Sequence, residues 1–310
     1  MSGSTAGGSS REPRFEEVAQ DVFAFHQPVG GWCVNNSGVV VGNGATLVVD
    51  TAATVDRARI LRAGVDARAA AGAATTVVNT HMHSDHTFGN CVFAPDAAFV
   101  AHELARKDMD RIGLGLQELW PEVGWGDVRL TLPRITFTDR MTVHVGGVLV
   151  ELLHFGAAHT TGDVVAWLPA ERVLFTGDLA MNGVTPFCLM GSVVGSLDVL
   201  ASLRKLEPVT VVPGHGQVGG PGMLDVCADY LRWVQGLAAA GVAAGLSPLA
   251  VARETRLGEW GELIDSERLV PNLVRAYAEE LGAAPGEEID EMDAFRQMVE
   301  FHGGLPACHA

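Results

Sequence analysis

Residues 80–86 constrain the fold and chemistry of this chain more than any other stretch, and they read Thr80-His81-Met82-His83-Ser84-Asp85-His86. The β-branched run at 75–78 before them predicts a buried strand. His81 and His83 lie two residues apart on a nearly extended backbone, so their side chains leave on the same side. Asp85 and His86 follow where the chain turns toward a short helix, so they can face elsewhere. One segment can therefore serve two neighbouring metal ions, and its donors suit zinc, and also iron or manganese.

A histidine-rich surface loop would be the simpler explanation, but the same ligand types recur at the ends of later predicted strands. They are His159 after the strand predicted at 148–155, Asp178 after 173–175, and His215 after 209–212. Functional loops typically begin where the strands of a rigid sheet end. The whole set is His81, His83, Asp85, His86, His159, Asp178 and His215. Five histidines and two aspartates are enough for two metals with open positions for water, as catalytic zinc sites require.

A site of this composition predicts hydrolytic or carbonyl chemistry. Two metals about 3.5–4 Å apart can share a water and lower its pKa from about 15.7 toward neutrality. The same pair can polarise a carbonyl group and stabilise an oxyanion or an enolate. Asp85 is placed both to bind a metal and to orient the water, so it is the predicted catalytic residue, with the role of moving the proton.

The complete pattern, H-x-H-x-D-H followed by the later His, Asp and His, closely resembles the metallo-β-lactamase-fold hydrolases over residues 15–240. The resemblance implies an α/β fold, a four-layer αββα sandwich, with two zinc ions. It assigns the first metal to His81, His83 and His159, and the second to Asp85, His86 and His215, with Asp178 bridging the two. Asp50 matches a position behind the ligands, although N-capping of the helix that follows explains this residue equally well.

Departures from the family pattern exclude several of its branches. Lactamases with a cysteine ligand would need Cys where Asp178 stands, and flavodiiron proteins carry Glu in place of His83 and an attached flavodoxin domain. The members that process RNA have basic surfaces and large extra domains, which the net charge of -16 disfavours. Glyoxalase II-like thioesterases, lactonases and the mononuclear-iron persulfide dioxygenases remain open.

Three further segments look like those of actinobacterial cyclases from aromatic (type II) polyketide pathways. They are GGWCVNN at 30–36, GVTPFCLMGS at 183–192 and LPACHA at 305–310. That family closes a ring by aldol condensation and can release the chain from its acyl carrier protein by thioester hydrolysis. The resemblance implies a polyketide substrate, carrier-bound or free. The predicted substrate-binding residues are Trp32, Asn35, Trp120, Trp125, Pro186, Phe187 and Met190.

Each of these assignments has an alternative. Ordinary core packing explains the apolar candidates about as well, and a β-turn is the more economical explanation of Asn35 and Asn36. For the function, the alternative is a general dizinc hydrolase, either a lactonase or a glyoxalase II-like thioesterase. A binding module with an inactive metal site is disfavoured, because all seven ligands are present.

Composition and charge limit the partners and the location. The acidic balance argues against nucleic acid, and no stretch is apolar and long enough to predict a signal peptide or a membrane span. The five cysteines are widely spaced and form no C-x-x-C motif, which fits a reduced, cytoplasmic protein. A homo-oligomer is compatible with the sequence.

The chain divides into three predicted regions. Residues 1–13 are Gly/Ser-rich and predicted to be disordered, 14–245 form the catalytic domain, and 246–310 form a C-terminal helical extension that could act as a lid. The helix predicted over 102–120 carries a basic patch of Arg106, Lys107 and Arg111, which could dock an acidic carrier protein. A solvated helix face paired with neighbouring acidic residues is the favoured alternative for this patch.

Overall fold

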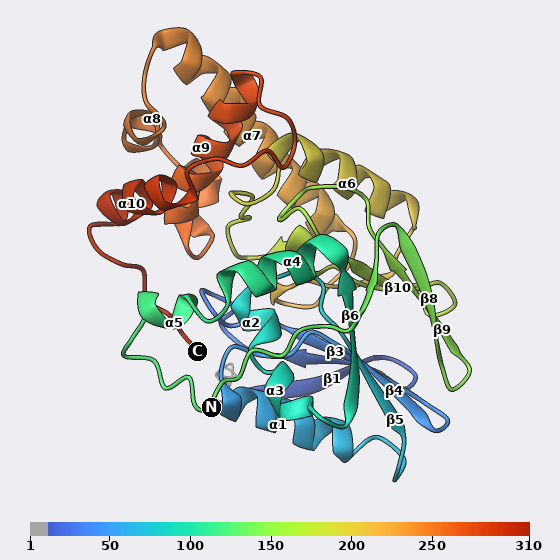
Figure 1. The fold of residues 1–310 in the computed structure, drawn as a ribbon. Coiled ribbons are helices and arrows are strands. Elements are labelled where there is room, and N and C mark those ends of the chain that lie inside the picture. The colour runs from blue at the N-terminus through green and yellow to red at the C-terminus, as the bar shows by residue number, and fades with distance from the viewer. Residues whose placement is uncertain (1–11) are drawn as a thin grey trace, which may run out of the picture.

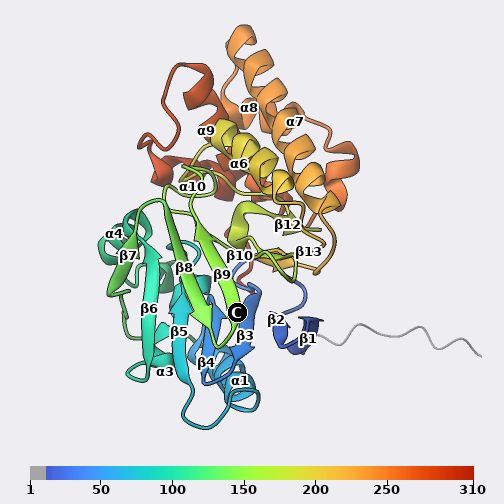
Figure 2. The ribbon, with the colours of Figure 1, turned by 90° about the vertical axis from the view of Figure 1, so that its right-hand side faces the viewer.

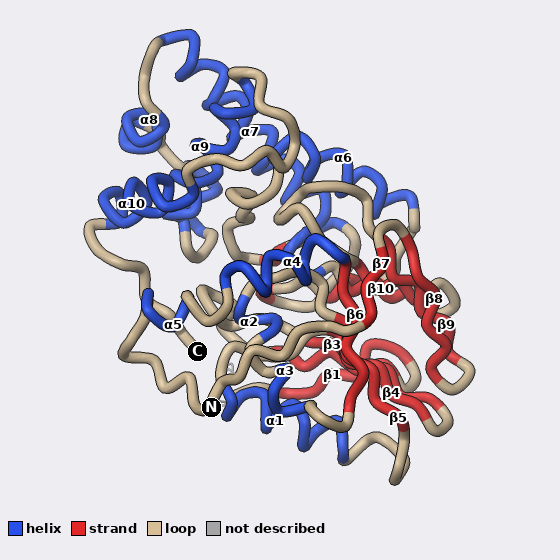
Figure 3. Tube along the Cα trace, in the orientation of Figure 1, coloured by secondary structure: helices blue, strands red, loops and turns tan. Residues whose placement is uncertain are grey.

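Two β-sheets packed face to face form the centre of the protein, and helices cover the outer face of each (Figures 1 and 2). The structure, a computed structural model, describes residues 12–310. The predicted disordered tail at 1–13 therefore lies almost entirely outside the described residues. Figure 3 shows the strands gathered in one half of the molecule and most of the long helices in the other.

The first sheet has seven strands in sequence order. They are β1 (Arg14–Ala19), β2 (Val22–His26), β3 (Ser37–Gly42), β4 (Ala45–Val49), β5 (Ala74–Val78), β6 (Ala97–His102) and β7 (Ile135–Phe137). Strands β1 to β4 are antiparallel, and the β3–β4 hairpin turns at Asn43-Gly44, a pair that favours the tightest hairpin turn. Strands β4 to β7 are parallel, so the carboxyl ends of β4, β5 and β6 meet at one edge.

The second sheet has the order β13-β11-β10-β9-β8. Its strands are β8 (Arg140–Val145), β9 (Val148–Leu153), β10 (Val165–Leu168), β11 (Val173–Phe175) and β13 (Thr210–Val212). Helix α6 (Val193–Lys205) crosses between β11 and β13, which run parallel. Two short strands, β12 (Met181–Asn182) and β14 (His215–Gly216), pair beside the sheet and position His215.

Strands buried on both faces explain the continuous apolar runs in the sequence. Val40 and Leu47 face the second sheet, while their neighbours Val39 and Val48 face the outer helices α1 (Val55–Asp66) and α3 (Asn90–Phe93). On the other side, α6 and α7 (Gly222–Ala244) cover the second sheet around Trp167. The predicted αββα sandwich is confirmed.

The helices of the C-terminal extension share the core of the main fold. They are α8 (Pro248–Glu254), α9 (Leu269–Glu280) and α10 (Glu291–His302). Leu273 and Met298 belong to the same buried cluster as Leu203 of α6. The carboxylate of Glu279 accepts hydrogen bonds from the first two amides of α6, Val193 and Val194, at 3.0 and 3.1 Å. The extension is thus packed against the sandwich along α6 and α7 (Figure 1).

One predicted helix is divided in the structure. The helix predicted over 102–120 is broken into α4 (Glu103–Ile112) and α5 (Leu116–Leu119). Gly113 ends α4 with a φ of +58°, a conformation that glycine adopts without strain.

Among residues 12–310, no single helix has both the length and the apolar character needed to cross a membrane. Only α7 and α8 together do, and the chain bends by 114° between them.

Candidate metal centre

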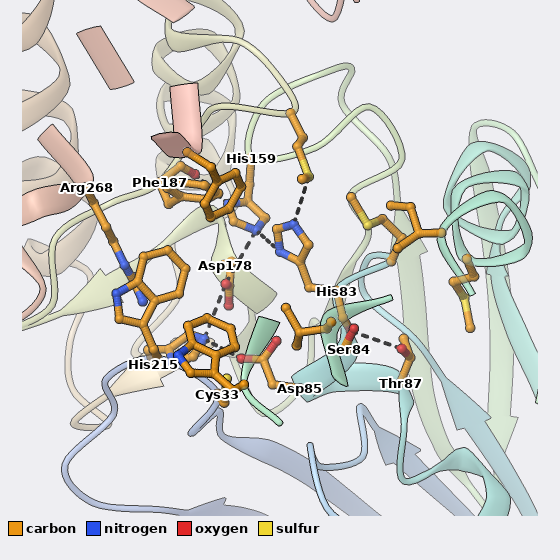
Figure 4. Close-up of a pocket in the computed structure, with 18 of the residues that line it drawn as sticks. Cys33, His83, Ser84, Asp85, Thr87, His159, Asp178, Phe187, His215 and Arg268 are labelled. Carbon is orange, nitrogen blue, oxygen red and sulfur yellow. Dashed lines mark hydrogen bonds and ion pairs between the residues drawn. The ribbon is translucent and has the colours of Figure 1, made fainter. Parts of the chain in front are cut away.

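All seven predicted ligands converge where the strand ends of the two sheets meet. Figure 4 labels those that also line the neighbouring cavity, namely His83, Asp85, His159, Asp178 and His215. They form two groups, and within each group the potential ligand atoms all lie within 4.8 Å of one another. The first group is His81, His83, His159 and Asp178, and the second is Asp85, His86 and His215. His81 and His83 follow β5, while Asp85 and His86 lie in the short helix α2 (Ser84–Thr87). The change from strand to helix therefore divides the motif between the two groups, as the spacing predicted.

Each of the five histidines has one ring nitrogen held by a neighbour and the other facing the centre. The outer nitrogens contact Thr80 Oγ1 (His81, 3.0 Å), Met190 Sδ (His83, 3.3 Å), Asp50 Oδ2 (His86, 2.8 Å), the Phe187 carbonyl (His159, 2.5 Å) and the Gly30 carbonyl (His215, 3.0 Å). Such contacts fix the tautomer and the ring orientation of metal-binding histidines. The inner nitrogens are consequently available for a metal.

The carboxylate of Asp178 lies among these inner nitrogens. Its oxygens are 3.1 Å from His86 Nε2, 3.3 Å from His215 Nε2 and 3.4 Å from His159 Nε2. Nevertheless, His86 Nε2 and Asp178 Oδ1 are buried and make no hydrogen bond of acceptable geometry. Buried polar atoms nearly always have a partner. A cation between the two would satisfy both, so the residues present fit a bound metal.

The electrostatics of the centre agree with this conclusion. Burial lowers the pKa of His81, His83 and His159, that of His83 to about 3, so these rings are neutral and can donate a lone pair. Burial also opposes charge on His215, but Asp178 and Asp85 outweigh it and raise its pKa to about 9. The carboxylates of Asp178 and Asp85 thus stabilise positive charge at the centre, and a divalent metal would supply that charge. Nitrogen and carboxylate donors in this ratio suit zinc.

Asp50 supports the centre from behind. It accepts hydrogen bonds from the backbone N–H and the hydroxyl of Thr80, both at 2.7 Å, and contacts His86 Nδ1 at 2.8 Å. It does not cap the following helix, because the N-cap of α1 is Thr54. The supporting role is therefore the one that the structure shows.

We expect Asp50→Asn to weaken zinc binding by about 10- to 100-fold, the usual cost of losing such a supporting contact. Asparagine keeps the size and tolerates the left-handed backbone of this position, φ +61°, so the change isolates the carboxylate. Competition with a chromophoric chelator measures the affinity. Asp56→Asn, on the exposed face of α1, is the control that should bind zinc like the wild type. Equal affinity in the two variants would contradict the assigned role.

A cavity opens directly beside the metal centre, with an inner volume of about 130 Å³, or about 870 Å³ when the open solvent at its mouth is included. Side chains from both groups of ligands form its floor, among them His83, Asp85 and Asp178. Its walls are mainly apolar: Trp32, Met82, Met109, Ile112, Leu116, Trp120, Leu130, Met181, Phe187, Met190 and Phe295. A cavity of this kind, apolar with a few convergent polar groups, is typical of small-molecule sites.

Four of the seven predicted substrate residues line this cavity, namely Trp32, Trp120, Phe187 and Met190. The other three do not. The amide of Asn35 is buried and bonded to the carbonyls of Asn36 and Thr51. Trp125 is buried and donates to the Trp120 carbonyl, and the Pro186 carbonyl accepts from Asn272. Asn35 and Trp125 through their side chains, and Pro186 through its backbone carbonyl, support the loops around the cavity, so their predicted contact with substrate is not what the structure shows.

The sequence interpretation missed several wall residues. Met109 and Ile112 lie on α4, whose helical spacing of apolar residues was the available signal. Phe295 belongs to an apolar stripe that predicted only packing. No sequence pattern pointed to Arg268. In the structure its buried guanidinium lies 4.1 Å from the ring centre of Trp32. The indole N–H of Trp32 donates a hydrogen bond to Glu267 at 2.6 Å. The C-terminal extension therefore supplies part of the cavity wall.

The predicted basic patch has a mixed charge. Arg111 pairs with Asp108 at 3.2 Å, and Arg106 donates to the Pro133 carbonyl. Lys107 and Arg111 border a side hollow together with four acidic residues, Asp108, Glu287, Glu288 and Glu291. The alternative of a paired helix face fits this arrangement, and docking of a carrier protein stays a prediction.

The family profile described as the metallo-beta-lactamase superfamily matches residues 30–215, more than half of the chain. The chain belongs to this superfamily. Membership and the His/Asp cluster together indicate a metal-dependent hydrolase with divalent metal, usually zinc. The matched range includes all seven residues of the centre and ends at His215.

Curated relatives align over part of their length. The chain is 29% identical over 147 residues to the 2,4-dinitroanisole O-demethylase subunit alpha of Nocardioides sp. (strain JS1661), covering 47% of this chain and 41% of that protein. It is 32% identical over 104 residues to the metallo-beta-lactamase type 2 of Bacteroides fragilis, covering 31% and 41%. Against the Bacillus cereus enzyme of the same name, 27% identity extends over 51% of this chain and 58% of the relative. The chain thus spans about half the length of these relatives.

A solved structure with the same fold is the DIM-1 metallo-beta-lactamase. It superposes with a TM-score of 0.59 at 21% identity, over 72% of this chain and 98% of that one. This likeness shows the fold of the sandwich. The C-terminal helices α8 to α10 lie beyond the family match, which ends at residue 215.

Proposed function

We propose that the protein is a dizinc polyketide cyclase/thioesterase. It closes a ring of an aromatic polyketide by aldol condensation and releases the product from an acyl carrier protein by thioester hydrolysis. The observation that carries this proposal is the cavity itself: three aromatic side chains, Trp32, Trp120 and Phe187, stand over the metal ligands. Flat aromatic walls suit a flat aromatic substrate, which they bind by stacking and by burial of apolar surface.

The residues of the centre have distinct roles in this proposal. When bound, two zinc ions would polarise a carbonyl group and lower the pKa of water. Asp85 faces the cavity, with its carboxylate 3.2 Å from His215 Nε2, and is the base beside the reacting atoms. In ring closure it takes the proton from the carbon between two carbonyls and returns it to the new alcohol oxygen. In hydrolysis it takes a proton from water and gives it to the departing thiolate sulfur, which leaves as the thiol.

The apolar walls serve the same chemistry by excluding bulk water from the substrate. A poly-β-ketone chain has several acidic carbons and several carbonyls, so its folding decides which ring forms. Trp32 is held in place by Glu267 and Arg268, and Trp120 by the Pro306 carbonyl at 2.8 Å. Walls fixed in this way can hold one folded form of the substrate near its reactive geometry.

The proposal is tested with the zinc-loaded protein and a carrier-bound poly-β-ketone, with products separated and identified by mass spectrometry. We expect a new ring pattern and free acid that both depend on the enzyme. Phe187→Ala should raise KM for this substrate by about tenfold while changing hydrolysis of a small acetyl thioester little, since only the long substrate reaches the aromatic walls. An unchanged ring pattern with the wild type would reject the cyclase.

The alternative is a general dizinc hydrolase, a lactonase or a glyoxalase II-like thioesterase. Faster turnover of simple lactones or of glutathione thioesters than of the carrier-bound chain would favour it. The same panel should include 2,4-dinitroanisole, because one relative is named as its demethylase. β-Lactams belong in the panel as well, although Asp178 stands where the resemblance would require a cysteine ligand.

A further inference from the structure

Two cysteines from distant parts of the sequence meet beside the cavity. Cys33 lines the cavity wall and is only 4% exposed (Figure 4). Cys308 lies in the segment that follows α10 and is partly exposed. Both are free thiols, and both pack in the apolar cluster around Trp120, where Cys33 is buried and Cys308 is partly buried.

The segment that carries Cys308 is held in place by three hydrogen bonds and has no helix or strand of its own. Trp120 Nε1 donates to the Pro306 carbonyl at 2.8 Å, the His309 N–H to the Trp32 carbonyl at 3.1 Å, and Arg57 to the His309 carbonyl at 3.0 Å. The bond between His309 and Trp32 sets their neighbours, Cys308 and Cys33, side by side. Figure 1 shows this end of the described chain beside α5.

The other three cysteines have other partners, although Cys91 belongs to the same apolar cluster as the pair. Cys91, Cys188 and Cys227 are buried and contact Phe88, Ser196 and Met181, respectively, rather than another thiol. Burial raises the pKa of Cys188 to about 12 and that of Cys227 to about 11, which makes both unreactive. In contrast, the neighbouring Cys33 thiol lowers the pKa of Cys308. Cysteines that react with peroxides typically have a lowered pKa, are accessible to solvent and lie next to a second thiol.

We propose that Cys33 and Cys308 form a thiol-oxidation site, at which a peroxide produces a disulfide that ties the segment after α10 to the cavity wall. The Cys308 thiolate attacks one peroxide oxygen and becomes a sulfenic acid, and the first water leaves. The Cys33 thiol then attacks the Cys308 sulfur, the S–S bond forms, and the hydroxyl group leaves as the second water. Two thiols lose two electrons and two protons in total, and one hydrogen peroxide is reduced to two waters.

The experiment treats the full-length, zinc-loaded protein with a small excess of hydrogen peroxide. The intact mass should fall by about 2 Da, the two hydrogens lost on disulfide formation. A tryptic digest without reductant should contain residues 15–57 joined to residues 297–310, because trypsin cuts after Arg14, Arg57 and Arg296. Reduction should separate the two peptides.

Variants assign the order of the two steps. Cys308→Ser should prevent the linkage, Cys33→Ser should stop at a Cys308 sulfenic acid that dimedone labels, and Cys91→Ser, the control, should link like the wild type. If the wild type keeps its mass, or if the linkage joins any other pair of cysteines, the proposal is wrong. The wild-type digest alone decides the matter if a variant fails to fold, and neither readout depends on the proposed catalytic activity.

Discussion

Asp178→Asn is expected to lower hydrolytic turnover by about 10³-fold or more, because it removes the one carboxylate that faces both groups of ligands. Asp178 lies between 3.1 and 3.8 Å from inner nitrogens of His81, His86, His159 and His215. Its pKa is held well below the usual range: burial alone would raise it, and the charges of His215 and His86 outweigh burial. Asparagine keeps the shape but removes the negative charge that would hold two cations close together.

The measurement combines zinc content with turnover of a thioester. We expect the variant to retain fewer than two zinc ions per chain after dialysis, and its kcat to fall with the metal. Asp127→Asn is a matched control, because Asp127 is exposed and pairs only with Arg129 at 3.7 Å. Two firmly bound zinc ions together with wild-type kcat in Asp178→Asn would contradict the bridging role.

The metal centre could be predicted from the sequence because its geometry is largely local. His81, His83, Asp85 and His86 are placed by one strand end and the first turn of a helix, and the known periods of strand and helix settle which side chains point together. The later three ligands follow strands with clear apolar runs. The family resemblance carried by these ligands implied the αββα sandwich, which the structure confirms.

The cavity wall could be predicted only in part, since its residues come from segments that meet through tertiary packing. Met109, Arg268 and Phe295 lie on three different helical segments, and no local pattern relates them. Trp125 was predicted on its residue type alone, yet its N–H donates to the Trp120 carbonyl and its ring is buried. Residue type could not distinguish a tryptophan that faces the cavity from one that supports it.

The C-terminal extension illustrates the same limit. Its amphipathic helices predicted a possible lid, but the sequence does not reveal what their apolar faces cover. Leu269 and Leu273 pack into the cluster shared with α6 and α7, so removing the extension would expose that core. A lid role is consequently better tested by Phe295→Ala, which alters the cavity wall and leaves α9 in place, than by truncation.

A second large effect is expected from pH and concerns His26, at the end of β2. Its side chain is 1% exposed, and neither ring nitrogen makes a hydrogen bond of acceptable geometry. Burial, together with the charge of Arg14, lowers its pKa to about 4, and a backbone contact with Gly216 opposes this only in part. The folded protein therefore holds His26 neutral at a pH where the unfolded chain, with a pKa of about 6.5, is protonated.

This difference in the pKa of His26 makes the folded protein less stable in acid. Because the pKa is lower in the folded state, the contribution of neutral His26 to stability is complete above about pH 6.5 and is lost as the pH falls toward 4. We expect the wild type to lose about 2 kcal/mol over this interval through His26 alone. His26→Phe should remove that part of the pH dependence, since phenylalanine fills the site without a group that takes up a proton.

Urea unfolding at pH 7.0, 5.5 and 4.5 measures the effect as the difference between the wild type and His26→Phe. Taking the difference cancels the acid-induced loss of metal, which both proteins share. His144→Phe, at an exposed position of β8, is the matched control and should lose stability in parallel with the wild type. If His26→Phe also follows the wild type in parallel, another buried group accounts for the acid sensitivity of the fold.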